Sequence, residues 1–369
     1  MNPRVIRTSG PVTAMAGEIA AAFDGLHPAA VMLFASDGEA LAPLSQELGG
    51  RFVAARIMGC SSAGGFAFGS YDSDGVVAIG LPSAHFAVSA VPLRGLHDAA
   101  ALQWMGALRS ASEGLGTVPG RSRFGILLID GLSQREELVS AMIDATLPGL
   151  LVLGGSAGDG LRFGRTHLAL DGRAVDGAVF CLMETDFRIE EVIFDHISPT
   201  PTRLVITDAR PEERLILEID AEPAADEYAR LIGAVRADLG PAHFAEFPLL
   251  VRIGGQQFVR AISGVTEGGG LRLMSSVATG EVMTIGRAED LTFGLEERLS
   301  RLEGAALILG FDCILRRIAL ERAGQQGIVA RLYHDYNVAG FNTYGEQHRG
   351  IHVNHTFVGL AFLPPEVRA

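Results

Sequence analysis

FDCILRRIALERAGQQGIVARLYHDYNVAGFNTYGEQHRGIHVNHT, residues 311–356, contains the pattern on which the fold depends. The apolar run ALILGFD (306–312) leads into it and is typical of a buried strand. The residues that follow, CILRRIALERAG, have the composition of a helix that ends at a glycine. A glycine-bounded polar loop, GFNTYGE (340–346), comes next, and residues 352–363 form another apolar strand. The segment therefore predicts one strand–helix–glycine-loop–strand unit.

The same order of elements occurs twice earlier in the chain, which indicates an internal repeat. The first copy has a strand, a helix and a strand before a glycine loop, at 31–38, 39–48, 53–58 and 59–65. The second copy has them at 124–131, 133–146, 150–154 and 154–160. The matched positions are Asp37 with Asp130, Ser62 with Ser156, Gly59 with Gly340, and Gly64 with Gly345. We predict an α/β fold in which duplicated strand–helix–strand–glycine-loop–strand units form mixed β-sheets flanked by helices, in two subdomains.

The middle of the chain separates these copies, and we place a domain boundary near residue 215. The predicted domains are therefore 27–215 and 216–363. Residues 192–209 predict a strand, a proline turn and a strand. The remaining expected elements are a helix from Pro223 to Gly240, hairpins at 249–264 (around Gly254-Gly255) and 272–285, and a helix at 287–302.

The composition excludes several classes of function. The net charge is −13, which disfavours binding to nucleic acids or to anionic membranes. The sequence contains no lysine, so a Walker A loop and Schiff-base catalysis are excluded. Three widely spaced cysteines without a CxxC pair support neither a disulfide framework nor a zinc knuckle. Because there is no signal-peptide pattern and no membrane-spanning run, we expect a cytoplasmic protein.

Three glycine loops in this order, GCSSAGG (59–65), GGSAGD (154–159) and GFNTYGEQ (340–347) followed by HVNHT (352–356), resemble those of the FIST sensory family. The resemblance extends over about 27–363 and implies an N-terminal and a C-terminal FIST domain. The segments FDHISPTPTRLVITDA, EPAADEYARLIG, QQFVRAI and FDCILRR are similar to bacterial members of the NosP type. That resemblance implies a haem-binding nitric-oxide sensor that regulates a histidine kinase or a cyclic-di-GMP enzyme in trans. His355 stands where the family usually has glutamine, and its role is left unassigned.

The haem hypothesis requires an axial imidazole and cations for the propionates. His196 is the first candidate ligand because it lies between an apolar strand and a proline-rigidified turn. His352 is the second candidate, and the structural alternative is a core histidine bonded to the glycine loop. The candidates for the propionates are Arg260, Arg316 and Arg317. For the last two, pairing with Asp312 or Glu321 is the structural alternative.

A haem-free sensor of amino acids or similar small anions is the first rival hypothesis. Its ligand would bind at the loop 340–346, whose polar side chains, with one from the next strand, are Asn342, Thr343, Tyr344, Glu346 and Asn354. For this loop, tight chain reversal is an equally good explanation. His334 and His348 lie in polar surroundings and are expected to be exposed.

The second rival is an enzyme with Cys60 or Cys313 as its nucleophile, with the thiol pKa of Cys313 lowered by a helix N-terminus. No GxSxG elbow or metal-ligand cluster supports catalysis, so we expect a sensor and not an enzyme. The expected cofactor is haem b, and the expected ligand is a gas or small molecule. A homodimer remains open.

Overall fold

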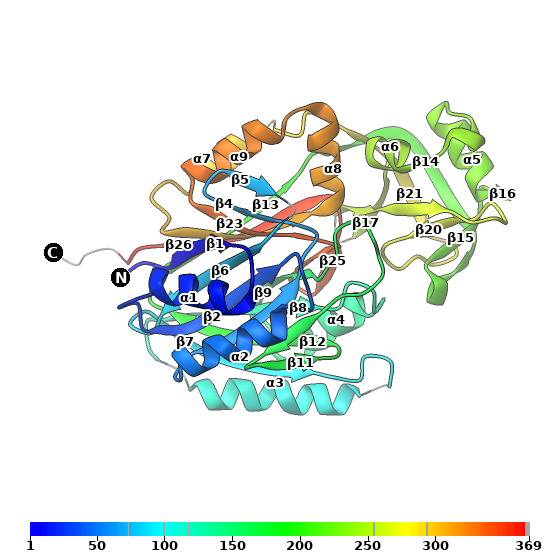
Figure 1. Cartoon of the computed structure of the whole chain (residues 1–369). Helices are drawn as coiled ribbons and strands as arrows, with labels where there is room; N and C mark the ends of the chain where they lie inside the picture. Colours follow the sequence, from blue (N-terminus) through cyan, green and yellow to red (C-terminus); the bar gives the residue numbers. More distant parts are fainter. Residues whose placement is uncertain (73, 99, 117, 254, 293, 366–369) are drawn as a thin grey trace.

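The computed structural model describes residues 1–365 except 73, 99, 117, 254 and 293. Within these residues, three mixed sheets form a body, and a fourth sheet forms a smaller lobe beside it (Figure 1). The predicted α/β fold with mixed sheets, flanking helices and two subdomains is confirmed. The domain limits 27–215 and 216–363 stay a prediction.

Each sheet of the body is built on one strand–helix–strand unit whose two strands are parallel. The first unit is β2 (Pro28–Ala35), α2 (Leu41–Arg51) and β3 (Arg56–Ser61). The second is β8 (Ser122–Ile129), α4 (Glu136–Thr146) and β9 (Leu151–Ser156). The third is β22 (Leu307–Cys313), α8 (Ile314–Ala323), α9 (Gln326–Asp335) and β23 (Val338–Thr343). The third copy of the repeat is therefore confirmed.

The units exchange strands in a cycle. A short hairpin leaves each second strand and completes the sheet of another unit. The hairpins are β4 (Gly65–Ala67) with β5 (Ser70–Asp72), β10 (Leu168–Leu170) with β11 (Arg173–Val175), and β24 (Glu346–His348) with β25 (Ile351–Val353). They join β23, β3 and β9 respectively, so the first unit extends the third, the second extends the first, and the third extends the second.

Antiparallel strands complete the other side of each sheet. They are β1 (Arg4–Thr8), β6 (Val76–Pro82), β7 (Phe86–Leu93), β12 (Ala178–Thr185), β13 (Arg188–Asp195) and β26 (Thr356–Leu363). The full orders are β1-β6-β2-β3-β10-β11, β7-β12-β8-β9-β24-β25 and β13-β26-β22-β23-β4-β5. The strand expected at 352–363 is therefore two strands that belong to different sheets.

A ring of backbone hydrogen bonds closes this exchange where the glycine loops meet. The N–H of Ala63 donates to the carbonyl of Asn342 at 2.9 Å, and that of Tyr344 donates to Ser156 at 3.1 Å. The N–H of Gly158 donates to Ser61, also at 3.1 Å. This register matches Ser61, and not Ser62, with Ser156. The sequence match was wrong by one residue because the two copies differ in length.

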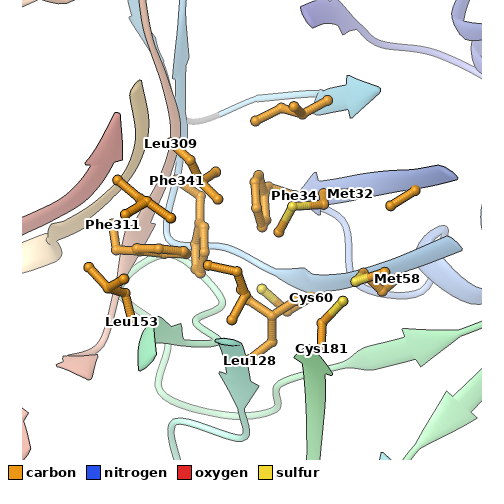
Figure 2. Packing of buried hydrophobic residues seen from close by; sticks show 14 of the residues in the cluster. Met32, Phe34, Met58, Cys60, Leu128, Leu153, Cys181, Leu309, Phe311 and Phe341 are labelled. Atoms are coloured by element: carbon orange, nitrogen blue, oxygen red, sulfur yellow. The ribbon is translucent and has the colours of Figure 1, made fainter. Parts of the chain in front are cut away.

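The interior of the body lies between the three sheets. Figure 2 shows Phe34 of β2 beside Phe341 of β23, and their ring centroids are 4.5 Å apart. Side chains of the second unit, including Leu128 and Leu153, lie in the same cluster. Alternate residues of each strand face outward and are covered by helices, which explains why the strands are apolar on both faces. The covering helices outside the units are α1 (Val12–Ala22), α3 (Ala101–Leu115) and α7 (Leu295–Ser300).

The lobe is an insertion between the second and third units, and its sheet has the order β18-β17-β21-β14-β15-β20-β19, with β16 against β15. Its strands are β14 (Ile197–Arg210), β15 (Leu215–Ile219), β16 (Glu222–Pro223), β17 (Leu249–Ile253), β18 (Gln256–Arg260), β19 (Ile262–Val265), β20 (Leu271–Leu273) and β21 (Val282–Ala288). Helices α5 (Ala224–Ile232) and α6 (Pro241–Glu246) pack on it (Figure 1). Short 3-10 turns lie at Pro211–Glu213 and Arg236–Asp238.

Several expectations for the lobe were wrong. The prolines of 192–209 lie at an irregularity within one long strand, β14, and not at a turn between two. Helix α5 ends at the left-handed Gly233 instead of Gly240. Strands β20 and β21 do not pair with each other, so 272–285 is not a hairpin. The hairpin at 249–264 is confirmed as β17 and β18, although Gly254 lies outside the described residues.

Candidate functional site

A pocket of about 430 Å³ lies where the body meets the lobe. Strands β13 and β26 of the body, β14, β17 and β18 of the lobe, and hairpin β24–β25 form its walls. Most lining side chains are apolar, among them Ile197, Leu250, Phe258 and Val353. A pocket with apolar walls and a few polar groups is the usual form of a small-ligand site.

His196 stands between two lining residues, Asp195 and Ile197, but its own side chain does not line the pocket and lies near Arg316 and His355. It is the one residue that connects β13 of the body to β14 of the lobe. Its side chain is buried, and neither ring nitrogen has a hydrogen-bond partner among the described residues. Burial, with smaller contributions from Arg316 and His355, lowers its pKa well below the usual value. The ring is therefore neutral and able to donate a lone pair.

His352 and Arg260 lie together in a second buried group between the body and the lobe, where β18 contacts β25. Burial lowers the pKa of His352 to about 4, although nearby Glu137 opposes the shift. Within the described part of the chain, Nε and one terminal nitrogen of Arg260 have no hydrogen-bond partner. A buried guanidinium without a direct partner is unfavourable unless a ligand or a water molecule accepts its free hydrogen bonds.

An ion cluster beside this group joins the body to the lobe. One terminal nitrogen of Arg214 lies 2.7 Å from carboxylate oxygens of both Glu136 and Glu137, at the start of α4. Glu137 also accepts the backbone N–H of Ser276 at 2.9 Å. Burial raises the pKa of Glu136 to about 7, and the charge of Arg214 limits the rise.

Asp312 is the centre of a separate buried network in the third unit. It accepts hydrogen bonds from Nε of Arg316 at 2.9 Å, from Tyr71 at 2.5 Å and from Tyr333 at 2.8 Å. Asn342 donates to the hydroxyl of Tyr71 at 3.0 Å. The network fixes β22 and β23 to α8 and α9, although one terminal nitrogen of Arg316 has no hydrogen-bond partner among the described residues.

Arg317 binds protein groups on α8, on β23 and in the loop between β3 and β4. Its Nε donates to Glu321 at 2.8 Å, and a terminal nitrogen donates to the carbonyl of Ala63 at 3.1 Å. The same nitrogen lies 3.4 Å from Oδ1 of Asn342. Arg316 and Arg317 therefore form the ion pairs with Asp312 and Glu321 that were predicted as the structural alternative to propionate binding.

Tyr344 closes the loop that follows β9. Its hydroxyl donates to Asp159, whose carboxylate also accepts the backbone N–H groups of Phe163, Gly164 and Arg165. The ring of Phe163 stacks on Tyr344 at 4.5 Å. The phenol is therefore part of a structural closure.

The rest of the expected loop ligand set is buried. Thr343 donates to Glu346, and burial raises the pKa of Glu346 well above its usual value. Asn354 donates to the carbonyl of Tyr344 at 3.3 Å, and its Oδ1 has no partner among the residues that the structure describes. Asn342 and Thr343 lie on β23 and not in a loop.

Comparison with family models assigns nearly the whole chain. The model of the FIST N domain matches residues 29–222, and the model of the FIST C domain matches 224–349. The chain belongs to the FIST family. FIST domains are sensory signal-transduction domains that bind small ligands and signal to partners, and they are not catalytic domains. A search of the curated proteins gave no match.

In this FIST protein the five predicted cofactor residues fall into three places. His196 lies near Arg316, His352 lies near Arg260, and Arg317 lies with Asn342. A buried basic group therefore accompanies each of the two candidate histidines. The described residues hold no cluster of three or more metal-ligating side chains.

Several expectations about reactive groups need correction. His348 is not exposed: its Nε2 lies 2.8 Å from Glu191, and it lines the pocket. His334 is exposed, as expected. Burial raises the thiol pKa of Cys313 and of Cys60, because a thiolate would be desolvated there. The helix N-terminus does not compensate at Cys313, and both thiols are poor nucleophiles.

Sequence reasoning missed the residues that link the body to the lobe. Arg214 is far in the sequence from the adjacent Glu136 and Glu137, and none of the three carried a motif. Asp159 stood within the glycine loop GGSAGDG but was not selected. His355 was noted because it departs from the family pattern. That departure was the signal in the sequence that could have singled it out. In the described part of the chain, no helix has the length and apolar character needed to cross a bilayer.

Proposed function

We propose that this FIST protein is a haem-based nitric-oxide sensor in which His196 is an axial ligand of haem b. The proposal rests on one observation: the buried imidazole of His196 has no hydrogen-bond partner at either nitrogen within the described residues. Buried polar groups are normally hydrogen-bonded, so such an imidazole indicates a partner other than a protein atom. Its lowered pKa, caused mainly by burial, favours the neutral form that binds metals.

The nearest pocket is lined by Asp195 and Ile197, on either side of His196, and not by His196 itself. Its walls are mostly apolar, as a macrocycle requires, and it includes Arg298, a cation for a propionate if the ring of His196 turns toward the pocket. The more deeply placed Arg316 is engaged by Asp312 and is less suited to that role. When bound, haem would supply an iron atom that takes up nitric oxide.

The position of His196 suggests how a signal leaves the site. Its carbonyl accepts the N–H of Glu289 at 2.8 Å, so it joins both chain crossings between body and lobe. A change in the bond to its imidazole would act directly on this connection. A partner in trans, either a sensor histidine kinase or an enzyme of cyclic-di-GMP metabolism, would respond to the new position of the lobe.

Haem reconstitution tests the proposal. Purified protein is titrated with haemin, and the Soret band is recorded before and after addition of nitric oxide. We expect a stoichiometric Soret band that shifts with nitric oxide, and at least a tenfold weaker affinity for His196→Ala. The matched control is His97→Ala, because His97 is exposed. Absence of a Soret band in the wild-type protein, or unchanged affinity in correctly folded His196→Ala, would overturn the proposal.

A haem-free sensor of small carboxylates is the second candidate, and Arg260 favours it. The buried guanidinium of Arg260 has two nitrogens without partners in the described chain, and His352 lies nearby. A carboxylate could accept a charge-assisted hydrogen bond from either nitrogen. The site is therefore better placed at Arg260 than at the loop 340–346.

Thermal shift measurements with glutamate, succinate and phosphate test this candidate. A ligand at 100 times its Kd would stabilise the folded protein by about 2.7 kcal/mol. Arg260→Gln should abolish the shift, whereas Arg252→Gln should keep it because Arg252 is an exposed residue of the neighbouring strand β17. A shift that persists in Arg260→Gln would contradict this assignment.

A further inference from the structure

The lobe, residues 197–288, is joined to the body by two chain crossings that lie side by side. His196 is the first crossing, and its carbonyl accepts the N–H of Glu289, directly after the second crossing, at 2.8 Å. Ile197 pairs with Ala288 next to them, at the start of β14. Two crossings bonded to each other can act as one hinge, because a few backbone torsions at this point suffice to rotate the lobe.

A second attachment, the latch, holds the lobe at the other end of β14. We define the latch as Arg214 and Ser276 of the lobe together with Glu136 and Glu137 of α4. Arg210, the last residue of β14, pairs with Leu215, the residue after Arg214. One terminal nitrogen of Arg214 lies 2.7 Å from both carboxylates, and Glu137 also accepts the N–H of Ser276. The latch therefore lies at the end of β14 that is away from the hinge.

Buried polar groups without partners lie beside the latch. Within the described chain, they include two nitrogens of Arg260, the hydroxyl of Ser275 and Nε2 of His352. Arg260 and Ser275 belong to the lobe, and the N–H of Met274 donates to the carbonyl of Ala261 at 2.9 Å, which brings the two segments together. His352 belongs to β25 of the body, which contacts both β18 and α4. Closure of the lobe leaves these groups unpaired, and water could pair them if the lobe opened.

The closed arrangement is therefore a balance of opposing contributions. The latch stabilises it, because separating a buried cation from its carboxylates is unfavourable. Contacts of α6 with α8 and of β18 with β25 add to closure. The unpaired groups oppose closure, and such a balance permits a minor open state that a ligand can shift.

We propose that the lobe is a hinged lid, that Arg214 is its latch, and that opening of the lid admits a small ligand to Arg260 and His352. The lid does not depend on the haem proposal, whereas the entry of a ligand rests on the second candidate function. A ligand that accepts hydrogen bonds from both Arg260 and His352 would bridge the lobe and the body and favour the closed lid.

Hydrogen–deuterium exchange, followed by mass spectrometry, tests the lid without any ligand. In Arg214→Met, we expect the amides of β18 and β25 to exchange about tenfold faster than in the wild-type protein, because local opening governs their exchange. The amides of β12, an interior strand of a body sheet, should exchange at an unchanged rate. The matched control is Arg210→Met, which removes only an exposed pair with Glu213.

A second variant guards against misfolding of the first. The double variant Glu136→Gln with Glu137→Gln removes the latch charges from the body and should give the same local acceleration. Unchanged exchange of β18 and β25 in both variants would overturn the lid. Equal acceleration of β12 would also overturn it, because Arg214 would then support the whole fold. If glutamate, succinate and phosphate all fail to bind, the second candidate function and its entry step fall, and local acceleration still supports the lid.

Discussion

Gly340 lies so close to the carbonyl of Gly310 that a Cβ atom on Gly340 would be 1.8 Å from that oxygen. The equivalent positions in the other units are Gly59 against Leu33 and Gly154 against Leu127, at 2.2 and 2.0 Å. At each of these three positions, the second parallel strand of a unit comes very close to the first strand. The first glycine of each loop motif is thus required for strand packing.

Gly340→Ala should therefore destabilise the protein strongly. The obstacle is backbone, which cannot move aside as a side chain can, so we expect a loss of about 3 kcal/mol or more in the free energy of unfolding. Urea denaturation measures it. The control is Gly106→Ala in α3, where nothing lies within 4 Å and alanine should stabilise by about 0.5–1 kcal/mol. Equal midpoints for the two variants would contradict the packing role.

The buried pair of Asp312 and Arg316 should contribute far more than an exposed pair of the same spacing. Arg316→Met leaves the carboxylate of Asp312 without its cation, and removal of one partner of a buried pair costs about 3–5 kcal/mol. Arg301→Met, in the exposed i,i+4 pair with Glu297, should cost only about 0.5 kcal/mol. Chemical denaturation of both variants would show similar losses if the network of Asp312 were unimportant.

His355 should make stability fall in acid. Burial lowers its pKa from 6.5 to about 4, so the unfolded chain binds a proton more readily than the folded protein does. The contribution is present above pH 6.5 and is lost as pH falls toward 4, with a total of the order of 3 kcal/mol. The difference in unfolding free energy between wild-type protein and His355→Gln, measured from pH 4 to 7, should rise with pH. A flat difference would show that the imidazole is not desolvated.

Glu136 should make stability fall as the pH rises, which is opposite to the effect of His355. Burial raises its pKa to about 7, so between pH 4.5 and 7 the folded protein binds the proton more readily than the unfolded chain. Its contribution is present below pH 4.5 and is lost as pH rises through 7. Relative to Glu136→Gln, which can still accept from Arg214, the wild-type protein should lose stability between pH 5 and 8. A constant difference over this range would indicate that Arg214 keeps Glu136 ionised throughout.

Much of the body could be predicted from the sequence because its signals are local. Apolar runs that are buried on both faces, helices between them and glycines at fixed positions identified all three units, including the third. The match of Gly59 with Gly340 was correct because a close backbone approach admits only glycine. The polar loop 340–346 was misjudged, since Asn342 and Thr343 are buried strand residues, and the partner of Asn342, Tyr71, comes from another part of the fold.

The sequence by itself determined the repeated α/β units, the family, and His196 and His352 as candidate ligands, since these depend on composition and short-range pattern. Only the tertiary structure decided which groups meet. Strand exchange brings the hairpin of the third unit to the second sheet, and insertion of the lobe places Arg260 beside His352. The register of β13 with β26 places His355 opposite His196. Such contacts join segments distant in sequence, and they arise only when sheets and lobe pack together.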